Sequence, residues 1–279
     1  MIRLPVHDIS SSLALYIDHK ILSVGQAYTN HSSEFYRLND KTFSSNSVYA
    51  SPYKQFVYDY AVSGAQVPSG VYVNGNFINK GTTGLKIDYL NGRAIFNQNN
   101  NGFTVSGDYA VKDFNIYVNP VSNQELLFES KFELRPTFPQ SLTGLNSNQA
   151  VAPAIFIENL SSSSEDLAFG GLDKCYYNYS CMILADSNYQ LEGVANILMD
   201  LKRKHFCVLD ETPINRFGDF KSGNYHYWDY VAAHSQYQAF ISDVDFFKVI
   251  ANTDNNILKK YKDLRLGYCE FEIEVHRYT

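Results

Sequence analysis

The feature that most constrains the fold is a period-two alternation of apolar and polar residues, interrupted at short intervals by turn-forming residues. It is clearest near the C-terminus, in YCEFEIEVHRY (268–278). There, Cys269, Phe271, Ile273 and Val275 alternate with Glu270, Glu272, Glu274 and His276. Successive side chains of a strand point to opposite faces of a sheet, so this segment would have one buried and one solvated face. Such alternation is typical of an antiparallel sheet.

Two further stretches with this pattern centre on Asn-Gly dipeptides. Asn74-Gly75 lies within VYVNGNFI, and Asn91-Gly92 lies within GLKIDYLNGRAIF. Asn-Gly favours a two-residue type I′ turn, because both central residues of that turn need a positive φ. Each stretch therefore predicts a β-hairpin.

A two-residue loop in the second hairpin would place Tyr89 opposite Ala94 and Ile87 opposite Phe96. Further strands are predicted over residues 103–111, 114–118 and 125–134. The β-rich region from about residue 47 to residue 135 is expected to form a meander or a small barrel.

In two segments the apolar residues recur at the helical period instead. Residues 8–24 predict one helix. A second helix, over residues 187–205, would be capped by Asp186 or Ser187 and end at the basic run 202–205. Its apolar stripe consists of Leu191, Val194, Ala195, Leu198 and Leu201.

The C-terminal half combines this helix with strands at 152–160, 177–185, 206–210, 239–250 and 268–278. The polar stretch SSSSED (161–166) is typical of a solvated loop. We therefore predict an α+β protein: a C-terminal antiparallel sheet with packed helices, plus an inserted β-rich meander or small barrel. The expected domains are an N-terminal helix and lead-in that joins the C-terminal core (1–46), a β-rich hairpin domain (47–139) and an α+β core (140–279).

Charge and cysteine content limit the expected partners. The net charge of −6 argues against a nucleic-acid-binding surface, and the short basic run Lys202-Arg203-Lys204-His205 is expected to complement the dipole at the end of the second helix. No apolar run approaches the ~20 residues of a membrane helix. The N-terminus lacks a signal peptide's hydrophobic region, which predicts a protein made in a cytoplasm. The cysteines form no CxxC pair and are expected to be free thiols rather than zinc ligands or disulfides: Cys175, Cys181, Cys207 and Cys269.

No arrangement of residues in the sequence predicts catalysis, a metal ion or a cofactor. Asp243 and Asp245 share one strand face, as do the glutamates of 270–275, but no histidine stands at a useful spacing, so we interpret both as solvated faces. The aromatic segment GNYHYWDY (223–230) is either a local core plug or a protein interface, with sugar stacking as a smaller alternative. We assign no catalytic, metal-binding or cofactor-binding residue.

Two segments together resemble virion structural proteins of tailed bacteriophages. Residues 84–118 contain an IDYxNGRxxF hairpin followed by a VSGxYxVKxFNxY strand pair, a combination that recurs in such proteins. The C-terminal half is similar in pattern to neck and tail-completion (tail terminator) proteins: an edge strand, a helix after ADSNYQLEG and a final FEIEVHR strand. Proteins of this kind form rings, usually hexameric, at the junction of head and tail and catalyse no reaction. This chain is longer than a compact tail terminator, so its β-rich region would be an insertion.

The resemblance implies a non-enzymatic ring protein of the virion, in the neck or at the head-proximal end of the tail. Its implied partners are further copies of itself, in a hexamer, and neck, connector, tail-tube or sheath proteins. DNA would pass through without specific binding, and no membrane is involved. The candidate subunit-interface residues are Asn74, Gly75, Tyr89, Asn91, Gly92, Arg93, Tyr225, Tyr227, Trp228 and Tyr230. A carbohydrate- or receptor-binding β module of the tail or baseplate is the alternative, for which the aromatic segment is the reason.

Overall fold

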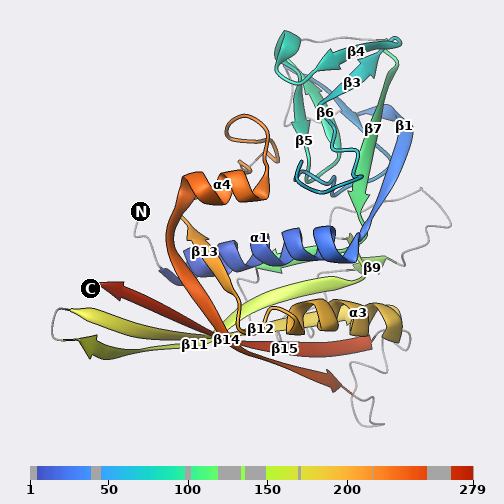
Figure 1. Cartoon of the computed structure of the whole chain (residues 1–279). Coiled ribbons are helices and arrows are strands. Elements are labelled where there is room, and N and C mark those ends of the chain that lie inside the picture. The colour runs from blue at the N-terminus through green and yellow to red at the C-terminus, as the bar shows by residue number, and fades with distance from the viewer. Residues whose placement is uncertain are drawn as a thin grey trace. The chain divides into compact units, whose positions relative to one another are not determined.

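Figure 1 shows the fold as a computed structural model, which describes residues 5–38, 45–97, 102–118, 133–135, 149–168, 171–215, 217–249 and 265–278. The chain is a mixed α+β protein in which strands predominate. It divides into two compact units. Unit 1 consists of residues 1–26, 113–211 and 231–279, and unit 2 consists of residues 27–112 and 212–230.

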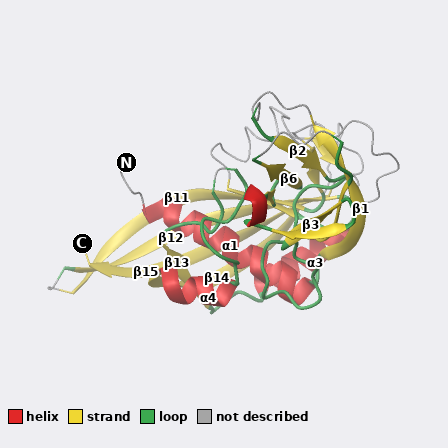
Figure 2. Ribbon diagram, turned by 90° about the horizontal axis from the view of Figure 1, so that it is seen from above, coloured by secondary structure: helices red, strands yellow, loops and turns green. Residues whose placement is uncertain are grey.

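Unit 1 contains a six-stranded sheet with the strand order β13-β14-β15-β12-β11-β8. Its strands are β8 (Asn115–Val118), β11 (Ala154–Ala168), β12 (Leu172–Ala185), β13 (His205–Leu209), β14 (Ser235–Val249) and β15 (Arg265–Tyr278). Neighbouring strands are antiparallel, except that β8 and β11 run parallel. A separate parallel pair is formed by β9 (Glu133–Arg135) and β10 (Gln149–Val151). The long strands curve together, as Figure 2 shows.

The period-two pattern of the C-terminal segment is realised in β15. Every second residue from Cys269 to Val275 is buried, and the residues between them are exposed or half-buried. Both neighbours of β15, which are β12 and β14, run antiparallel to it. The alternation thus marks a strand with one covered and one solvated face.

Unit 1 also contains two helices at the predicted positions. The first is α1 (Pro5–Gly25). The second, α3 (Asn188–Met199), begins after Ser187, whose Oγ accepts a hydrogen bond from Gln190 N at 3.2 Å. Its buried residues are Leu191, Val194, Ala195 and Leu198, and the helix contacts β12, β14 and β15. A third helix, α4 (Tyr227–His234), was not predicted; its residues 227–230 belong to unit 2 and its residues 231–234 to unit 1.

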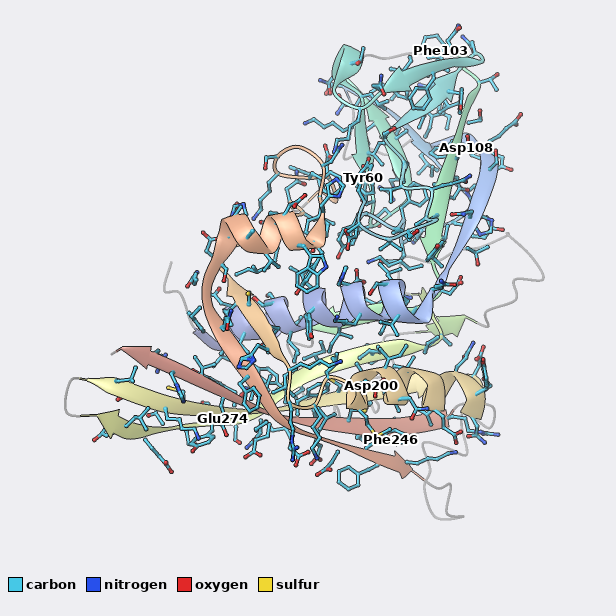
Figure 3. All side chains as sticks on the ribbon, viewed as in Figure 1. Tyr60, Phe103, Asp108, Asp200, Phe246 and Glu274 are labelled. Carbon is cyan, nitrogen blue, oxygen red and sulfur yellow. The ribbon has the colours of Figure 1, made fainter. Side chains whose placement is uncertain are left out.

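The helix α3 ends before the basic run, so the predicted role of that run is wrong. Asp200, labelled in Figure 3, is the C-cap, and the last turn of α3 contains no basic residue. Arg203 adopts a left-handed φ of 61°, and its N–H donates to Ile241 O at 2.8 Å. Lys202 forms an ion pair with Asp243 of β14. The run therefore spans the sharp turn after α3 and ends at His205, the first residue of β13.

Unit 2 contains a seven-stranded sheet with the strand order β4-β3-β7-β1-β2-β6-β5. Its strands are β1 (Tyr28–Leu38), β2 (Ser47–Ala50), β3 (Gly70–Val73), β4 (Asn76–Asn79), β5 (Lys86–Asp88), β6 (Arg93–Phe96) and β7 (Val105–Lys112). All neighbours are antiparallel, and a short 3-10 helix, η2 (Thr82–Gly84), precedes β5. The sequence did not predict β1, because Phe35 is its only buried residue and the strand shows no apolar alternation.

Two predicted features of the strands are wrong. β7 and β8 are not a pair, because β7 pairs with β1 and β3 in unit 2 whereas β8 pairs with β11 in unit 1. The polar stretch 161–166 is not a loop, because β11 runs through it and pairs with residues 173–178 of β12. The backbone pairing, not the side chains, keeps this stretch extended. The predicted strand over 125–134 lies outside the described residues, apart from its end in β9.

The units also differ from the predicted domain limits. α1 belongs to unit 1, whereas β1, from the same predicted N-terminal segment 1–46, belongs to unit 2. Residues 212–230 return from the C-terminal half of the chain to complete unit 2. The limits predicted at 47 and 140 therefore do not coincide with the ends of the compact units.

Candidate functional site

The first Asn-Gly turn is present as predicted and is exposed. Asn74 and Gly75 join β3 to β4 with φ values of 50° and 83°, the left-handed values that a type I′ turn requires. The N–H of Asn74 donates to Thr104 O at 2.8 Å, and its Oδ1 accepts from Thr104 N at 3.0 Å. A Cβ added to Gly75 would meet no atom within 4 Å. The turn is therefore anchored at its base and open at its tip.

The strand that follows this turn forms an edge of the sheet. Among the described strands, β4 has β3 as its single neighbour in the seven-stranded sheet. Phe77 of β4 is 48% exposed, and its ring makes an edge-on contact with Tyr72 at a centroid distance of 5.1 Å. An edge strand offers backbone N–H and C=O groups to another chain, and an exposed aromatic ring adds apolar area. The β3–β4 hairpin is thus well suited to pairing with another chain.

The second Asn-Gly turn differs from the predicted one. β5 and β6 place Asp88 opposite Arg93, so four residues, not two, form the loop. Tyr89 therefore lies in the loop and not opposite Ala94. Within this loop only Gly92, with a φ of 65°, is left-handed. Loops of four residues are commonly built around a type I turn, which needs no left-handed asparagine.

The Asp88 carboxylate explains the longer loop. Its Oδ1 accepts hydrogen bonds from Leu90 N at 3.1 Å and Asn91 N at 3.0 Å, and its Oδ2 accepts from Asn91 Nδ2 at 2.8 Å. Aspartate commonly stabilises turns by such bonds to residues that follow it. Asp88 is only 3% exposed, and this burial raises the pKa of its carboxyl above the usual value, although the bonds to Asn91 and the charge of Arg93 oppose the rise.

The backbone of this second turn is occupied within its own unit. The carbonyl oxygens of Tyr89, Leu90 and Gly92 accept hydrogen bonds from the N–H groups of residues 56, 55 and 51, at 2.8, 3.1 and 2.8 Å. A Cβ on Gly92 would clash with the carbonyl oxygen of Tyr53. The Tyr89 hydroxyl is buried and donates to Pro68 O at 2.8 Å. The backbone of this turn is bonded to the rest of unit 2, so the turn does not project as an arm, although Leu90 and Asn91 are exposed.

The aromatic segment 223–230 is also tied to unit 2. Asp59 Oδ1 accepts hydrogen bonds from Tyr227 N at 3.1 Å and Ala61 N at 2.9 Å. The Tyr225 carbonyl accepts from the N–H of Tyr60, which is labelled in Figure 3, at 2.9 Å. α4 begins at Tyr227, so the segment is a helix start and not a free loop.

The residues just before the aromatic segment make contacts that the sequence did not predict. Gly218 has a φ of 78°, a Cβ there would clash with Asp88 Oδ1, and its carbonyl accepts from Tyr89 N at 2.9 Å. Lys80 Nζ lies 3.3 Å from Asp219 Oδ1 and 3.9 Å from the ring centroid of Phe220. Burial lowers the pKa of the Lys80 ammonium, and the charge of Asp219 opposes this. These contacts attach residues 212–230 to the second hairpin.

The carboxylates that the sequence placed on two separate strand faces meet in the sheet of unit 1. Asp245 lies directly opposite Glu270, and Asp243 lies opposite Glu272. Lys202 pairs with Asp243, and Lys174 Nζ lies 2.9 Å from Glu274 Oε2. Like charges directly opposite each other destabilise a sheet. Among the described residues, no group of three or more histidine, cysteine or acidic side chains could hold a metal ion.

The structure separates the candidate interface residues by exposure. The exposed ones are Asn74, Gly75, Asn91 and Trp228; Arg93 and Tyr230 are half-buried; Tyr89, Gly92, Tyr225 and Tyr227 are buried. Trp228, at the start of α4, is 55% exposed and its indole packs edge-on against the Tyr227 ring, with a centroid distance of 5.0 Å.

The contact between Gly218 and Asp88 was not predicted from the sequence. Its only sequence signal is a glycine flanked by polar and aromatic residues in NRFGDF.

No protein-family model matches this chain, and comparison with curated proteins finds no relative. None of the helices in the described ranges has the length and apolar character needed to cross a membrane.

Proposed function

We propose that this protein is a non-enzymatic structural component of a tailed phage particle, forming a ring in the neck or at the head-proximal end of the tail. The observation that carries the proposal is the resemblance of residues 84–118 to a stretch that recurs in tailed-phage virion proteins. In the fold, this stretch provides β5, β6 and β7 of unit 2 and β8 of unit 1.

The open edge of β4 supports an assembled role for the protein. A hairpin whose tip is solvated and whose edge strand carries exposed Phe77 can pair with a neighbouring subunit by strand addition. We propose that subunits of a closed ring, six in number, meet partly through this hairpin, with Asn74 and Gly75 at the contact. The partners would then be further copies of the chain and the adjoining neck, connector, tail-tube or sheath proteins.

The acidic face of the unit 1 sheet fits passive passage of DNA. Asp243, Asp245, Glu270 and Glu272 lie on adjacent strands, and a surface of this sign repels the phosphate backbone instead of holding it. In this proposal, the ring guides DNA without specific binding. The protein is made in the host cytoplasm and resides in the virion.

Labelling of the protein in the parent particle, by immunogold or by reconstruction, tests the proposal directly. We expect label at the junction of head and tail. Label scattered singly over a capsid would refute the ring. In isolated particles, a cysteine at Asn76, on the exposed edge strand, should cross-link one copy to the next under oxidation. A cysteine at Asn91, on the packed turn, is the matched control and should cross-link less.

One observation favours a second candidate, a carbohydrate- or receptor-binding β module of the tail or baseplate. The exposed indole of Trp228 could stack on a sugar ring, as aromatic faces at binding surfaces do. A glycan array separates the two candidates. Strong and specific sugar binding that Trp228→Ala abolishes would support the binding module and contradict the neck assignment.

A further inference from the structure

The paired ends of β11 and β12 form a ribbon whose β11 strand is exposed. We call residues 158–168 of β11 and 172–178 of β12 the distal ribbon. β8 covers the edge of β11 as far as Ile157, and in the part of the chain that the structure describes no other strand pairs with the rest of that edge. Residues 160–167 are all exposed, and in Figures 1 and 2 the ends of these strands extend past the helices of unit 1.

The exposure of the distal ribbon is unusual for a strand beside a covered face. Ser162 pairs with Tyr177 and Ser164 pairs with Cys175, and both partners on β12 are buried. The serines beside them are nevertheless exposed. The cover of this face thus ends at β12, and β11 continues beyond it with mostly polar side chains, among which Leu160 and Leu167 are exposed. A long open edge of this kind invites pairing with another chain.

The tip of the distal ribbon concentrates negative charge. Asp166 lies directly opposite Asp173, which has Arg277 of β15 on its other side, and Glu165 precedes Asp166 on β11, so the acidic residues outnumber this arginine. Glu165 lies opposite Lys174, but the Lys174 ammonium is 2.9 Å from Glu274. Like charges directly opposite each other destabilise a strand pair, so a cationic partner at this tip would relieve repulsion.

The matching positive surface lies at the other edge of the same sheet. The basic turn consists of Lys202, Arg203 and Lys204 before β13 and of His205, the first residue of β13, and all four are exposed. Lys202 is paired with Asp243. The backbone of Arg203 and Lys204 bonds to Ile241 of β14, which fixes the turn at the sheet edge.

The two surfaces cannot meet within one chain. β14, β15 and β12 separate β13 from β11, which is four inter-strand spacings of about 4.8 Å, or roughly 19 Å along the sheet. Complementary surfaces at opposite edges of one element make a head-to-tail contact between identical copies, and such contacts close into a ring when the rotation permits.

We propose that the distal ribbon of one copy docks against the basic turn of the next copy. This inference rests on the proposed homo-oligomeric ring and names a surface through which unit 1 takes part in it. The contact is mainly electrostatic, so it should weaken as salt rises from about 0.05 M to about 0.5 M. A ribbon-to-ribbon dimer is the competing arrangement, and it would bring two acidic tips together.

Charge reversal in the full-length protein distinguishes these arrangements. Sedimentation equilibrium at low salt should show wild-type species heavier than the 31.7 kDa monomer. Glu165→Lys with Asp166→Lys should weaken association by about tenfold or more, and so should Arg203→Glu with Lys204→Glu. The variant with all four changes restores opposite charges in the head-to-tail contact and should return close to wild type. In a ribbon-to-ribbon dimer it would behave like the Glu165/Asp166 double variant.

A matched control reverses Asp245 and Glu270 to lysine. These residues are exposed on the same sheet and give the same change in net charge, but they lie outside both surfaces. Association of the control should equal that of wild type. An equimolar mixture of the two double variants should associate, because the reversed surface of each variant has the charge opposite to that of the reversed surface's partner on the other. Circular dichroism should first show that each double variant is folded.

The contact is refuted if the wild type stays monomeric at low salt, or if the four-residue swap fails to restore association while folding normally. Either result leaves the particle-labelling test untouched, because a ring could close through the β3–β4 hairpin alone. Conversely, head-to-tail association in solution with no label at the head–tail junction would keep the contact and discard the proposed location.

Discussion

The Asp88 carboxylate should set the structure of the second turn, and Asp88→Ala tests this. The change removes the acceptor for three hydrogen bonds, from Leu90 N, Asn91 N and Asn91 Nδ2. An unsatisfied buried donor costs about 1–3 kcal/mol, but Leu90 and Asn91 are themselves exposed, so water can reach part of the site. We expect unit 2 to lose about 2–4 kcal/mol of unfolding free energy.

Asp88→Asn is the matched control. Its amide oxygen can keep both backbone bonds, and the side chain of Asn91 can turn its own oxygen toward the new Nδ2. The cost should therefore stay below about 1 kcal/mol. Gly218 packs against the same carboxylate, and the asparagine fits there because it is nearly the same size.

The asparagine variant and the wild type should also differ in the pH dependence of their stability. Burial raises the pKa of the folded Asp88 carboxyl above the usual 3.8, so the folded state holds its proton to higher pH than the unfolded state does. The stabilising contribution of the protonated form is then complete below the unfolded pKa and is lost as pH rises through the folded pKa. Asp88→Asn should remove this loss. The unfolding free energy of the asparagine variant, relative to that of the wild type, should therefore increase as pH rises from the unfolded to the folded pKa of Asp88.

Urea unfolding followed by tryptophan fluorescence is the suitable assay, because the single tryptophan, Trp228, belongs to unit 2. A lower urea midpoint with an unchanged slope reports a change in stability alone. An Asp88→Ala midpoint equal to that of wild type would show that the four-residue loop does not depend on this carboxylate.

Three further predictions concern unit 1. Leu198→Asp buries an unpaired charge on α3 and should cost several kcal/mol by thermal unfolding, whereas Asn196→Asp on the exposed face should change little; equal melting temperatures would mean that α3 is not packed on the sheet. Gly267→Ala places a Cβ 2.7 Å from Phe246 Cε2 and should cost about 1–3 kcal/mol through overpacking, as calorimetry can measure. Cys207 is half-buried, whereas Cys175, Cys181 and Cys269 are buried, and burial raises the pKa of Cys269 to about 12. Cys207 should therefore react first with a thiol reagent in the native protein, and equally rapid labelling of the other three cysteines would contradict their burial.

Local patterns in the sequence were sufficient wherever one face of an element is buried. The alternation around Phe271 and the helical spacing around Leu191 both record burial, and they predicted β15 and α3. Capping is equally local: the sequence offered Asp186 or Ser187 as the cap of α3, and Ser187 takes this role. The exposed Asn74-Gly75 turn was predicted correctly because its own two residues determine its conformation.

The sequence failed where pairing alone determines the structure. β1 buries only Phe35, and residues 161–166 of β11 are all polar, so neither stretch carries an apolar alternation. The return of residues 212–230 to unit 2 depends on contacts between segments far apart in the chain, such as that of Gly218 with Asp88. No periodicity within a short window reports a contact of that kind.

The two Asn-Gly dipeptides form turns that differ in length, in backbone conformation and in exposure. At Asn74-Gly75 both residues are left-handed, the strands pair up to the turn, and the tip meets only solvent. At Asn91-Gly92, Asp88 accepts hydrogen bonds from Asn91, and the loop has four residues. The carbonyl groups of this loop accept hydrogen bonds from residues 51, 55 and 56 of unit 2. A subunit contact through a hairpin tip therefore belongs to the first turn. The second turn, although it lies in the stretch that carries the family resemblance, contributes to the stability of the unit that holds the first one in place.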